Sequence, residues 1–317
     1  MAQAEFSQSN SQSDYLQQIR ASVARRELIS RLFGLLGLLV ISIATLILIA
    51  LVAQLFVQGL PRLNWKFFTS FPSSDFNEAG ILSAWVGSLL VMLTTMVIAV
   101  PLGVAAGIYL EEYAPKNWLA ALIEINVTNL AGVPSIVYGL LALGLFSTVL
   151  NLGESILTAG LTLALLILPI VIVTTREALR AIPSSLREAA YALGASRWQM
   201  IWDHILPYSS GSILTGIIIG LSRAIGETAP LITIGALTFI AFLPPSPIQS
   251  QFPFISFEWL TAPFTVLPIQ MFNWISRPQP EFQVNAAAAG VVLILLTLTL
   301  NAFAIYLRYR LRKGVKW

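Results

Sequence analysis

Six long apolar stretches constrain this chain more than any other feature of its sequence. They cover roughly residues 32–57, 81–110, 127–150, 155–175, 209–243 and 286–307. A helix needs about 20 mostly apolar residues to cross the hydrocarbon layer of a bilayer, and each stretch is long enough. Only 10% of the residues are charged, whereas soluble domains carry about a quarter. The sequence therefore predicts an all-α polytopic membrane protein with six transmembrane helices.

Two of the predicted spans contain helix breakers. Gly226 and Pro230 interrupt the fifth stretch, which is longer than one crossing requires, and Gly132-Val133-Pro134 interrupts the third. Proline removes a backbone donor and clashes with the preceding turn. Irregular backbone at membrane depth is tolerated only where protein or a water-filled cavity covers it. We therefore expect both helices to kink or end here, with the breaks facing inward.

The distribution of Lys and Arg residues predicts the orientation. Arg62, Lys66 and Arg277 lie on one side of the membrane and Arg223 lies within a span, while all other Lys and Arg residues lie on the side of the N-terminus. Because cytoplasmic segments carry the excess of positive charge, both termini are expected in the cytoplasm.

The predicted organisation follows from this orientation. It consists of a cytoplasmic tail at 1–31, a six-span domain at 32–307 and a basic cytoplasmic tail at 308–317. Within the first tail, the Gln- and Ser-rich residues 1–19 are expected to be disordered. The outer loop at 244–285 carries Trp259 and Trp274, which suit the headgroup region.

The inner loop at 176–208 carries strong helix signals. Ser185 and Glu188 have the spacing of a capping box, and Gly194 suits a helix end. One face of this helix would carry Leu186, Ala189, Ala190 and Leu193. A second short helix is expected from Ser196 to about Ile205, ending before Pro207. The pattern fits a helix lying on the membrane interface as well as one that docks on a partner protein.

Arg223 and Glu227 are the charged residues that lie well inside a predicted span. Burying a charge there costs about 3 kcal/mol on insertion scales, so a partner is expected, and side chains four residues apart share one helix face. Two interpretations stay open. The pair neutralises itself within the bundle, or Arg223 binds an anion in a translocation path and Glu227 weakens that binding enough for release.

Three hydroxyl side chains are further candidates for the same path. They are Ser135, Tyr138 and Thr228. Hydroxyl groups in spans also make hydrogen bonds between helices, so this alternative stays open for each of them.

Several kinds of site are absent from the sequence. The chain has no cysteine and a single histidine, His204, so neither a thiolate nor a histidine cluster can hold a metal. His204 is expected to be a structural hydrogen-bonding residue. No Gly-x4-Gly-Lys-[Ser/Thr] loop is present, so the chain is not expected to hydrolyse ATP, and no nucleophile and base set supports a membrane enzyme. Glu111 and Glu112 are expected to be solvated loop charges.

The motifs of the inner loop and of the fifth span resemble those of a known family. Glu188-Ala189-Ala190-x3-Gly194, followed by Leu206-Pro207, resembles the EAA loop of ABC-importer permeases, except that the family usually has an apolar residue in place of His204. The run 223–231 is similar to the fifth span of A-type (PstA-type) permeases of phosphate importers. The segments 132–140, 174–183 and 264–270 are similar to this type as well. The resemblance extends from about residue 80 to the C-terminus.

This resemblance implies a type I ABC-importer (MetI-like) permease fold and a subunit that transports inorganic phosphate across a bacterial inner (plasma) membrane. It implies a C-type permease as heterodimer partner, two ATP-binding subunits that hold ATP and Mg, and an extracytoplasmic phosphate-binding protein. No cofactor, metal or nucleic acid is implied for this chain itself. Sulfate, molybdate, phosphonate or another polar solute stays an alternative cargo, and a proton-coupled carrier using Glu227 stays an alternative mechanism.

With this resemblance, two groups of site residues are assigned. The substrate path would be lined by Arg223, Glu227, Thr228, Ser135 and Tyr138. The contact with the ATPase would be made by Ser185, Leu186, Glu188, Ala189, Ala190, Leu193 and Gly194.

Overall fold

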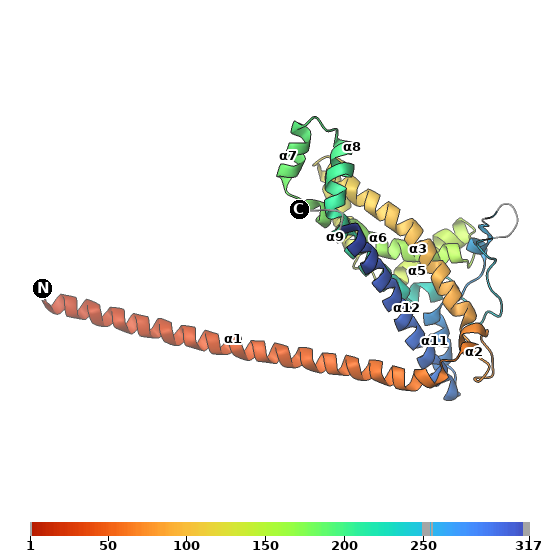
Figure 1. The fold of residues 1–317 in the computed structure, drawn as a ribbon. Helices are drawn as coiled ribbons and strands as arrows, with labels where there is room; N and C mark the ends of the chain where they lie inside the picture. The colour runs from red at the N-terminus through yellow and green to blue at the C-terminus, as the bar shows by residue number, and fades with distance from the viewer. Residues whose placement is uncertain (1, 249–253, 255, 313–317) are drawn as a thin grey trace. The chain divides into compact units, whose positions relative to one another are not determined.

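The computed structural model describes residues 2–248, 254 and 256–312, and every regular element within them is a helix (Figure 1). The chain forms two units, one up to residue 57 and one from residue 58 onward. The end of the predicted C-terminal tail, residues 313–317, lies outside the described residues.

The described residues of the first unit all belong to one helix, α1 (Ala2–Gly59). Its stretch from Ile29 is long and apolar enough to span a membrane, and its side chains there are exposed, as lipid-facing side chains would be. Residues 2–19, expected to be disordered, belong to the same helix, so that expectation is wrong. Gln, Ala, Glu and Arg are good helix formers, and extending an existing helix costs much less than starting one.

The second unit contains the remaining long helices. They are α3 (Leu82–Ile108), α6 (Ile156–Arg180), α9 (Leu206–Ile225) with the turns before it, and α12 (Glu281–Arg312). Together with α1, the described residues hold five helices able to cross a membrane, or six if the bent pair at Trp118–Leu130 and Ser135–Val149 counts as one. The predicted six spans correspond to this second count.

Shorter helices connect these spans. They are η1 (Leu60–Arg62), α2 (Trp65–Thr69), η2 (Tyr109–Tyr113), α4 (Trp118–Leu130), α5 (Ser135–Ala142), η3 (Leu143–Val149), α7 (Ser184–Ala192), α8 (Arg197–Gln199), η4 (Met200–Ile205), α10 (Ala229–Thr233), η5 (Glu258–Thr261) and α11 (Leu267–Ile275).

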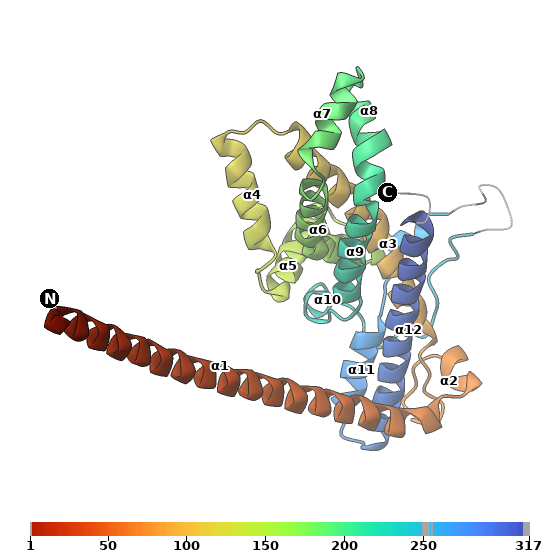
Figure 2. The same ribbon diagram turned by 60° about the vertical axis from the view of Figure 1, so that its left-hand side comes forward.

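Helix α6 is the centre of the second unit. It packs against α3 and α9, and α12 packs against α9 and α11. Figure 2 shows α6 between α4 and α9. Most of the side chains of α6 are buried, and they form one apolar core with residues of α3, α5 and α10. This core holds the broken spans in place.

Both predicted helix breaks are present, although the spans around them differ from the prediction. The third stretch is two helices, α4 and α5, which meet at 106° across residues 131–134. In the fifth stretch α9 ends at Ile225, and α10 ends at Thr233, just before Gly235, whose φ of 87° is the left-handed conformation that glycine adopts easily. The predicted continuation of this span to residue 243 is therefore wrong.

Part of the predicted outer loop is buried in the core. Phe264 and Trp274 are 1% and 0% exposed, and the Leu267 amide donates to Ser88 Oγ at 2.9 Å. Trp259 and Trp274, expected at the lipid headgroups, are both covered by protein. The apolar run 262–270 explains this, because burying it completes the core while Ser88 and the amide of Ile156 satisfy its backbone groups.

Gly87 of α3 lies where this buried segment comes closest to the helix, and its replacement should destabilise the fold. A Cβ at position 87 would overlap the backbone oxygen of Thr265, so Gly87→Ala is expected to lower the free energy of unfolding by about 1–3 kcal/mol. The measurement is thermal or denaturant unfolding of the purified chain in detergent. Gly144→Ala is the control, because nothing lies within 4 Å of a Cβ there. Equal stability of the two variants would contradict the packing described.

Candidate functional site

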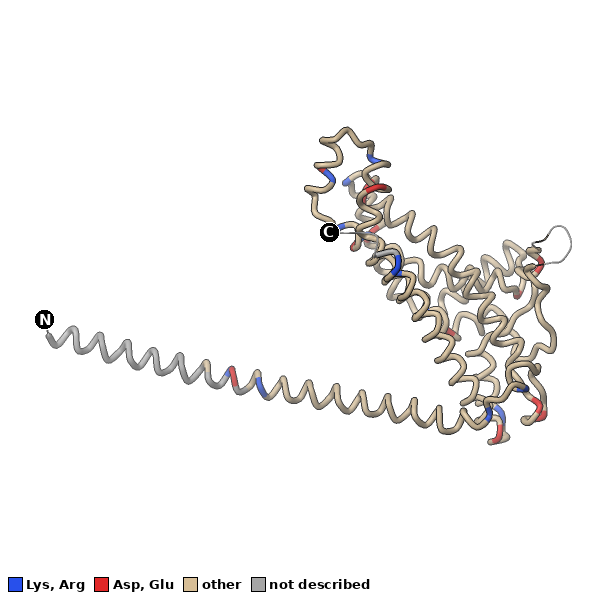
Figure 3. Tube along the Cα trace, viewed as in Figure 1, with Lys and Arg blue, Asp and Glu red and all other residues tan. Residues whose placement is uncertain are grey.

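The predicted ion pair is present where α9 ends. Arg223 lies in the last turn of α9, Gly226 closes that helix, and Glu227 follows before α10 begins. Arg223 Nε donates to Glu227 Oε1 at 3.4 Å, and the two side chains are 38% and 19% exposed. Figure 3 shows that Lys, Arg, Asp and Glu gather near the two ends of the second unit, with little charge between them.

The guanidinium of Arg223 keeps most of its donors available. Its contact with Glu227 is long and uses Nε, and neither Nη atom donates to another described residue. A guanidinium binds an oxyanion through two parallel N–H donors. The Nη donors of Arg223 are therefore available to an anion, while the carboxylate of Glu227 partly neutralises the charge of the guanidinium.

The two broken spans meet beside this pair. Helix α10 packs against α5, and Gly139 allows the close approach because a Cβ there would overlap Thr233 Oγ1 and the backbone of Pro230. Helices α5 and α10 thus lie close together, but the two breaks themselves are not covered in this chain, because Gly132, Pro134 and Gly226 are exposed.

The three hydroxyl candidates have different surroundings. Tyr138 is buried, and its hydroxyl donates to the Leu130 carbonyl at 2.8 Å, across the break between α4 and α5. Ser135 begins α5 and Thr228 precedes α10, and both are half-buried. The Tyr138 hydroxyl thus stabilises the bend between α4 and α5, while Ser135 and Thr228 lie at the two breaks themselves.

The first helix of the inner loop starts differently from the prediction. Helix α7 begins at Ser184 after Pro183, with no side-chain cap, so the predicted capping box of Ser185 and Glu188 is wrong. Pro183, with ψ of 140°, ends the extended chain and starts the helix one residue earlier, which leaves Ser185 inside its first turn. The capping box forms instead at Ser196 and Gln199, where each side chain bonds the other's backbone amide.

The end of α7 agrees with the prediction. Gly194 has φ of 81°, its amide donates to the Tyr191 carbonyl at 2.9 Å, and the Ala195 amide donates to the Ala190 carbonyl at 3.0 Å. This is the Schellman arrangement in which glycine ends a helix.

The side chains expected on one face of α7 are divided between two environments. Ala190 is buried and Leu186 is half-buried against Met200 and Ile201. Leu193 is 87% exposed, and Ala189 is exposed as well. One part of α7 thus anchors the helix to the rest of the unit, and the other part is open to a partner.

The second loop helix does not end before Pro207. It runs through α8 and the π-helical turn η4 directly into α9, so the chain is helical from Arg197 to Ile225. Pro207 lies in the first turn of α9, where its missing donor costs little. The prediction of a separate short helix is therefore wrong, and the inner-loop residues from Arg197 onward belong to the same helical rod as Arg223. His204, half-buried, lies in its π turn.

Sequence analysis missed a network of charges behind α7, because Glu111 and Glu112 are not solvated loop charges. Glu112 is 8% exposed, and Arg187 Nη2 donates to it at 2.7 Å. Arg187 also donates to the carbonyls of Leu179 and Ile182 at 2.9 and 2.8 Å. Arg187 of α7 is thereby bonded to η2, which directly follows α3, and to the C-terminal end of α6.

Glu111 binds the arginines of α6. Its carboxylate lies 3.0 Å from Arg180 Nη2 and 3.5 Å from Arg176 Nη2, and Arg176 also pairs with Glu124 of α4 at 2.9 Å. The sequence did contain a signal for these ion pairs, because Glu111 and Glu112 are predicted on the same side of the membrane as most of the arginines. Among the described residues, no group of three His, Cys, Asp or Glu is placed to hold a metal ion.

Comparison with known proteins adds to this geometry. Residues 99–317 match the family described as binding-protein-dependent transport system inner membrane component. The chain is 38% identical to the phosphate transport system permease protein PstA of Yersinia pestis, over 80% of this chain and 82% of that protein. It is 31% identical to the phosphate transport system permease protein PstC of Xylella fastidiosa (strain Temecula1 / ATCC 700964), over 60% and 68%.

A solved structure has a similar fold. It is a bacterial alginate ABC transporter in complex with an alginate pentasaccharide-bound periplasmic protein. The TM-score is 0.63 with 14% identity, over 90% of this chain and 97% of that one.

The bond between Glu112 and Arg187 should stabilise the protein measurably. A double-mutant cycle of Glu112→Gln and Arg187→Gln is expected to give a coupling free energy of about 1–3 kcal/mol, because both side chains are largely buried. The same cycle on Lys66 and Glu78, whose side chains are 53% and 55% exposed, should give less than about 1 kcal/mol. Chemical unfolding in detergent measures both, and equal couplings would contradict the role assigned to burial.

Proposed function

This chain belongs to the family of binding-protein-dependent transport system inner membrane components, and we propose that within it the chain is the A-type permease subunit of an importer for inorganic phosphate. The phosphate transport permeases among its relatives support this cargo, and the higher identity to a PstA than to a PstC protein supports the A type. The chain carries no phosphate-binding loop of its own, so ATP and Mg would be bound by a partner.

The observation that carries the proposal is the exposed guanidinium of Arg223 at the break between α9 and α10. Its two Nη atoms are available, and a phosphate offers two oxygens at the matching spacing. Glu227 accepts from Arg223 when no anion is present and can accept the proton of a protonated phosphate oxygen when one is. Because Glu227 competes for the guanidinium, the anion is bound weakly enough to leave.

The helical rod from Arg197 to Ile225 explains how a separate motor would act on this site. Two ATP-binding subunits would bind the exposed part of α7 and close on ATP, which moves α7 together with α8 and η4. Because the rod is continuous, this movement reaches Arg223, at a distance of about 40 Å along the helix. Alternating access then follows from reorientation of α9 against α6 and α5.

The remaining partners complete the proposed transporter. A C-type permease would form the other half of the path, and a phosphate-binding protein would deliver phosphate to the outer segments. The protein would lie in the bacterial inner membrane with both termini in the cytoplasm, as the Lys and Arg distribution predicts. Hydrolysis of ATP by the partner would reset the inward-open state.

Replacing Arg223 tests the site directly. Arg223→Gln is expected to lower the uptake of radiolabelled phosphate by about tenfold or more at equal membrane levels, since a charge-assisted bidentate contact is lost. Arg223→Lys keeps the charge without the paired donors and should retain part of the uptake. Arg310→Gln, an exposed arginine of α12, is the control and should transport normally.

Three outcomes would refute this proposal. Undiminished uptake by Arg223→Gln would remove Arg223 from the path. Uptake of labelled sulfate or molybdate in preference to phosphate would assign another cargo. Uptake that follows the proton gradient in the absence of any ATP-binding subunit would make the chain a secondary carrier.

The exposed part of α7 gives a second prediction. Leu193→Asp should abolish co-purification of the ATP-binding subunits and ATP-dependent uptake, while the thermal stability of the isolated chain stays unchanged because Leu193 is 87% exposed. Trp65→Asp is the matched control, since Trp65 is 82% exposed but lies in α2, far from α7 (Figure 1). Normal co-purification with Leu193→Asp would show that the partner binds elsewhere.

A further inference from the structure

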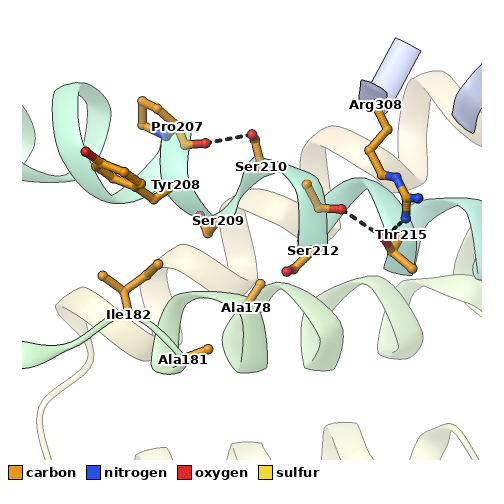
Figure 4. A pocket seen from close by; sticks show the side chains of 11 residues that line it. Ala178, Ala181, Ile182, Pro207, Tyr208, Ser209, Ser210, Ser212, Thr215 and Arg308 are labelled. Atoms are coloured by element: carbon orange, nitrogen blue, oxygen red, sulfur yellow. Dashed lines mark hydrogen bonds between the residues drawn. The ribbon is translucent and has the colours of Figure 1, made fainter. Parts of the chain in front are cut away.

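A polar cavity of about 300 Å³ lies where α6, α9 and α12 meet, at the same end of the second unit as α7 (Figure 4). Its walls are contributed by Ala178, Ala181, Ile182, Pro207, Tyr208, Ser209, Ser210, Gly211, Ser212, Thr215 and Arg308. The small side chains of α6 leave this space open, and α9 and α12 supply the polar groups. None of the site residues considered above for transport lines it.

Arg308 is the charged group of this cavity. Its Nη1 donates to Thr215 Oγ1 at 2.7 Å, and Thr215 in turn donates to the Gly211 carbonyl at 2.8 Å (Figure 4). Thr215 therefore holds the guanidinium in one orientation. Within the described part of the chain, Arg308 has no carboxylate partner, and its Nε and Nη2 make no hydrogen bond. An oriented arginine without a counter-charge is prepared to bind an anion.

The serine hydroxyls of α9 also line the cavity. Ser209 and Ser210 donate to the carbonyls of Ile205 and Pro207, whereas Ser212 makes no hydrogen bond to a described residue and is exposed at the cavity. The lining contains no acidic side chain. The cavity thus offers a cation and a hydroxyl donor, and its volume is about ten times that of a water molecule in the liquid.

We propose that this cavity is a binding site for a phosphoryl group. Nε and Nη2 of Arg308 form one edge of the guanidinium, which matches two oxygens of a tetrahedral phosphoryl group, and Thr215 holds that guanidinium in place. The ligand is either the headgroup of an anionic phospholipid or free inorganic phosphate, since both present the same oxygens. The site is separate from Arg223 and does not depend on what the chain transports.

Two binding assays on the purified full chain distinguish the two sources. In the first, the chain is held in nanodiscs of phosphatidylcholine and binding of radiolabelled inorganic phosphate is measured by equilibrium dialysis. An Arg223→Gln background keeps the α9 ion pair from contributing. In the second, the nanodiscs contain a minor fraction of phosphatidylglycerol and no free phosphate, and native mass spectrometry counts the phosphatidylglycerol retained.

Binding is expected in one of these assays, and Arg308→Gln should weaken it about tenfold. Arg310→Gln, two residues along α12, should leave it unchanged, because Arg310 does not line the cavity. Thr215→Val removes the hydroxyl that orients the guanidinium and should weaken binding about threefold, which keeps the test valid if Arg308→Gln fails to fold.

If the chain binds neither inorganic phosphate nor phosphatidylglycerol, the proposal is wrong. Equal losses in Arg308→Gln and Arg310→Gln would overturn it as well, because they would show attraction to the surface charge in general. Binding of phosphate in the first assay alone identifies the free anion as the ligand, and retention of phosphatidylglycerol in the second alone identifies the lipid.

Discussion

The continuous helix from Arg197 to Ile225 is the constraint on which the rest of the structure depends. A chain that crosses a bilayer must satisfy its backbone groups internally, and here a π turn lets the helix pass Pro207 without ending. As a result, the residues on which α7 packs and Arg223 lie on one continuous helix. A force applied at one end of it has to displace the other.

The ends of this rod are held in different ways. At the end near α7, the carboxylates of Glu111 and Glu112 bind arginines of α6 and α7, so three helices move together. At the other end, Gly226 terminates the helix and α10 is held against α5 by apolar packing around Gly139. The first end is thus held by an ion pair that is largely buried, and the second by small residues that allow close packing.

Irregular backbone within the bundle is satisfied by single side chains. The Tyr138 hydroxyl binds the carbonyl left at the end of α4, and Ser88 accepts the amide that begins α11. These hydroxyl groups explain why the chain tolerates a bend of 106° and a buried connecting segment. Tyr138 and Ser88 therefore have a structural role, in contrast to Ser135 and Thr228, which lie at the two breaks.

Residue patterns alone predicted the class of fold, the positions of the two helix breaks, the contact between Arg223 and Glu227, and the glycine that ends α7. Each of these depends on hydropathy, on a single residue's backbone preference, or on spacing within one turn. Helix packing, in contrast, accounts for the contact of Glu112 with Arg187, the burial of residues 264–270 and the continuation of α8 into α9. Those features depend on which helices pack together, and a local pattern of residues does not specify a partner that lies 75 positions away in the chain.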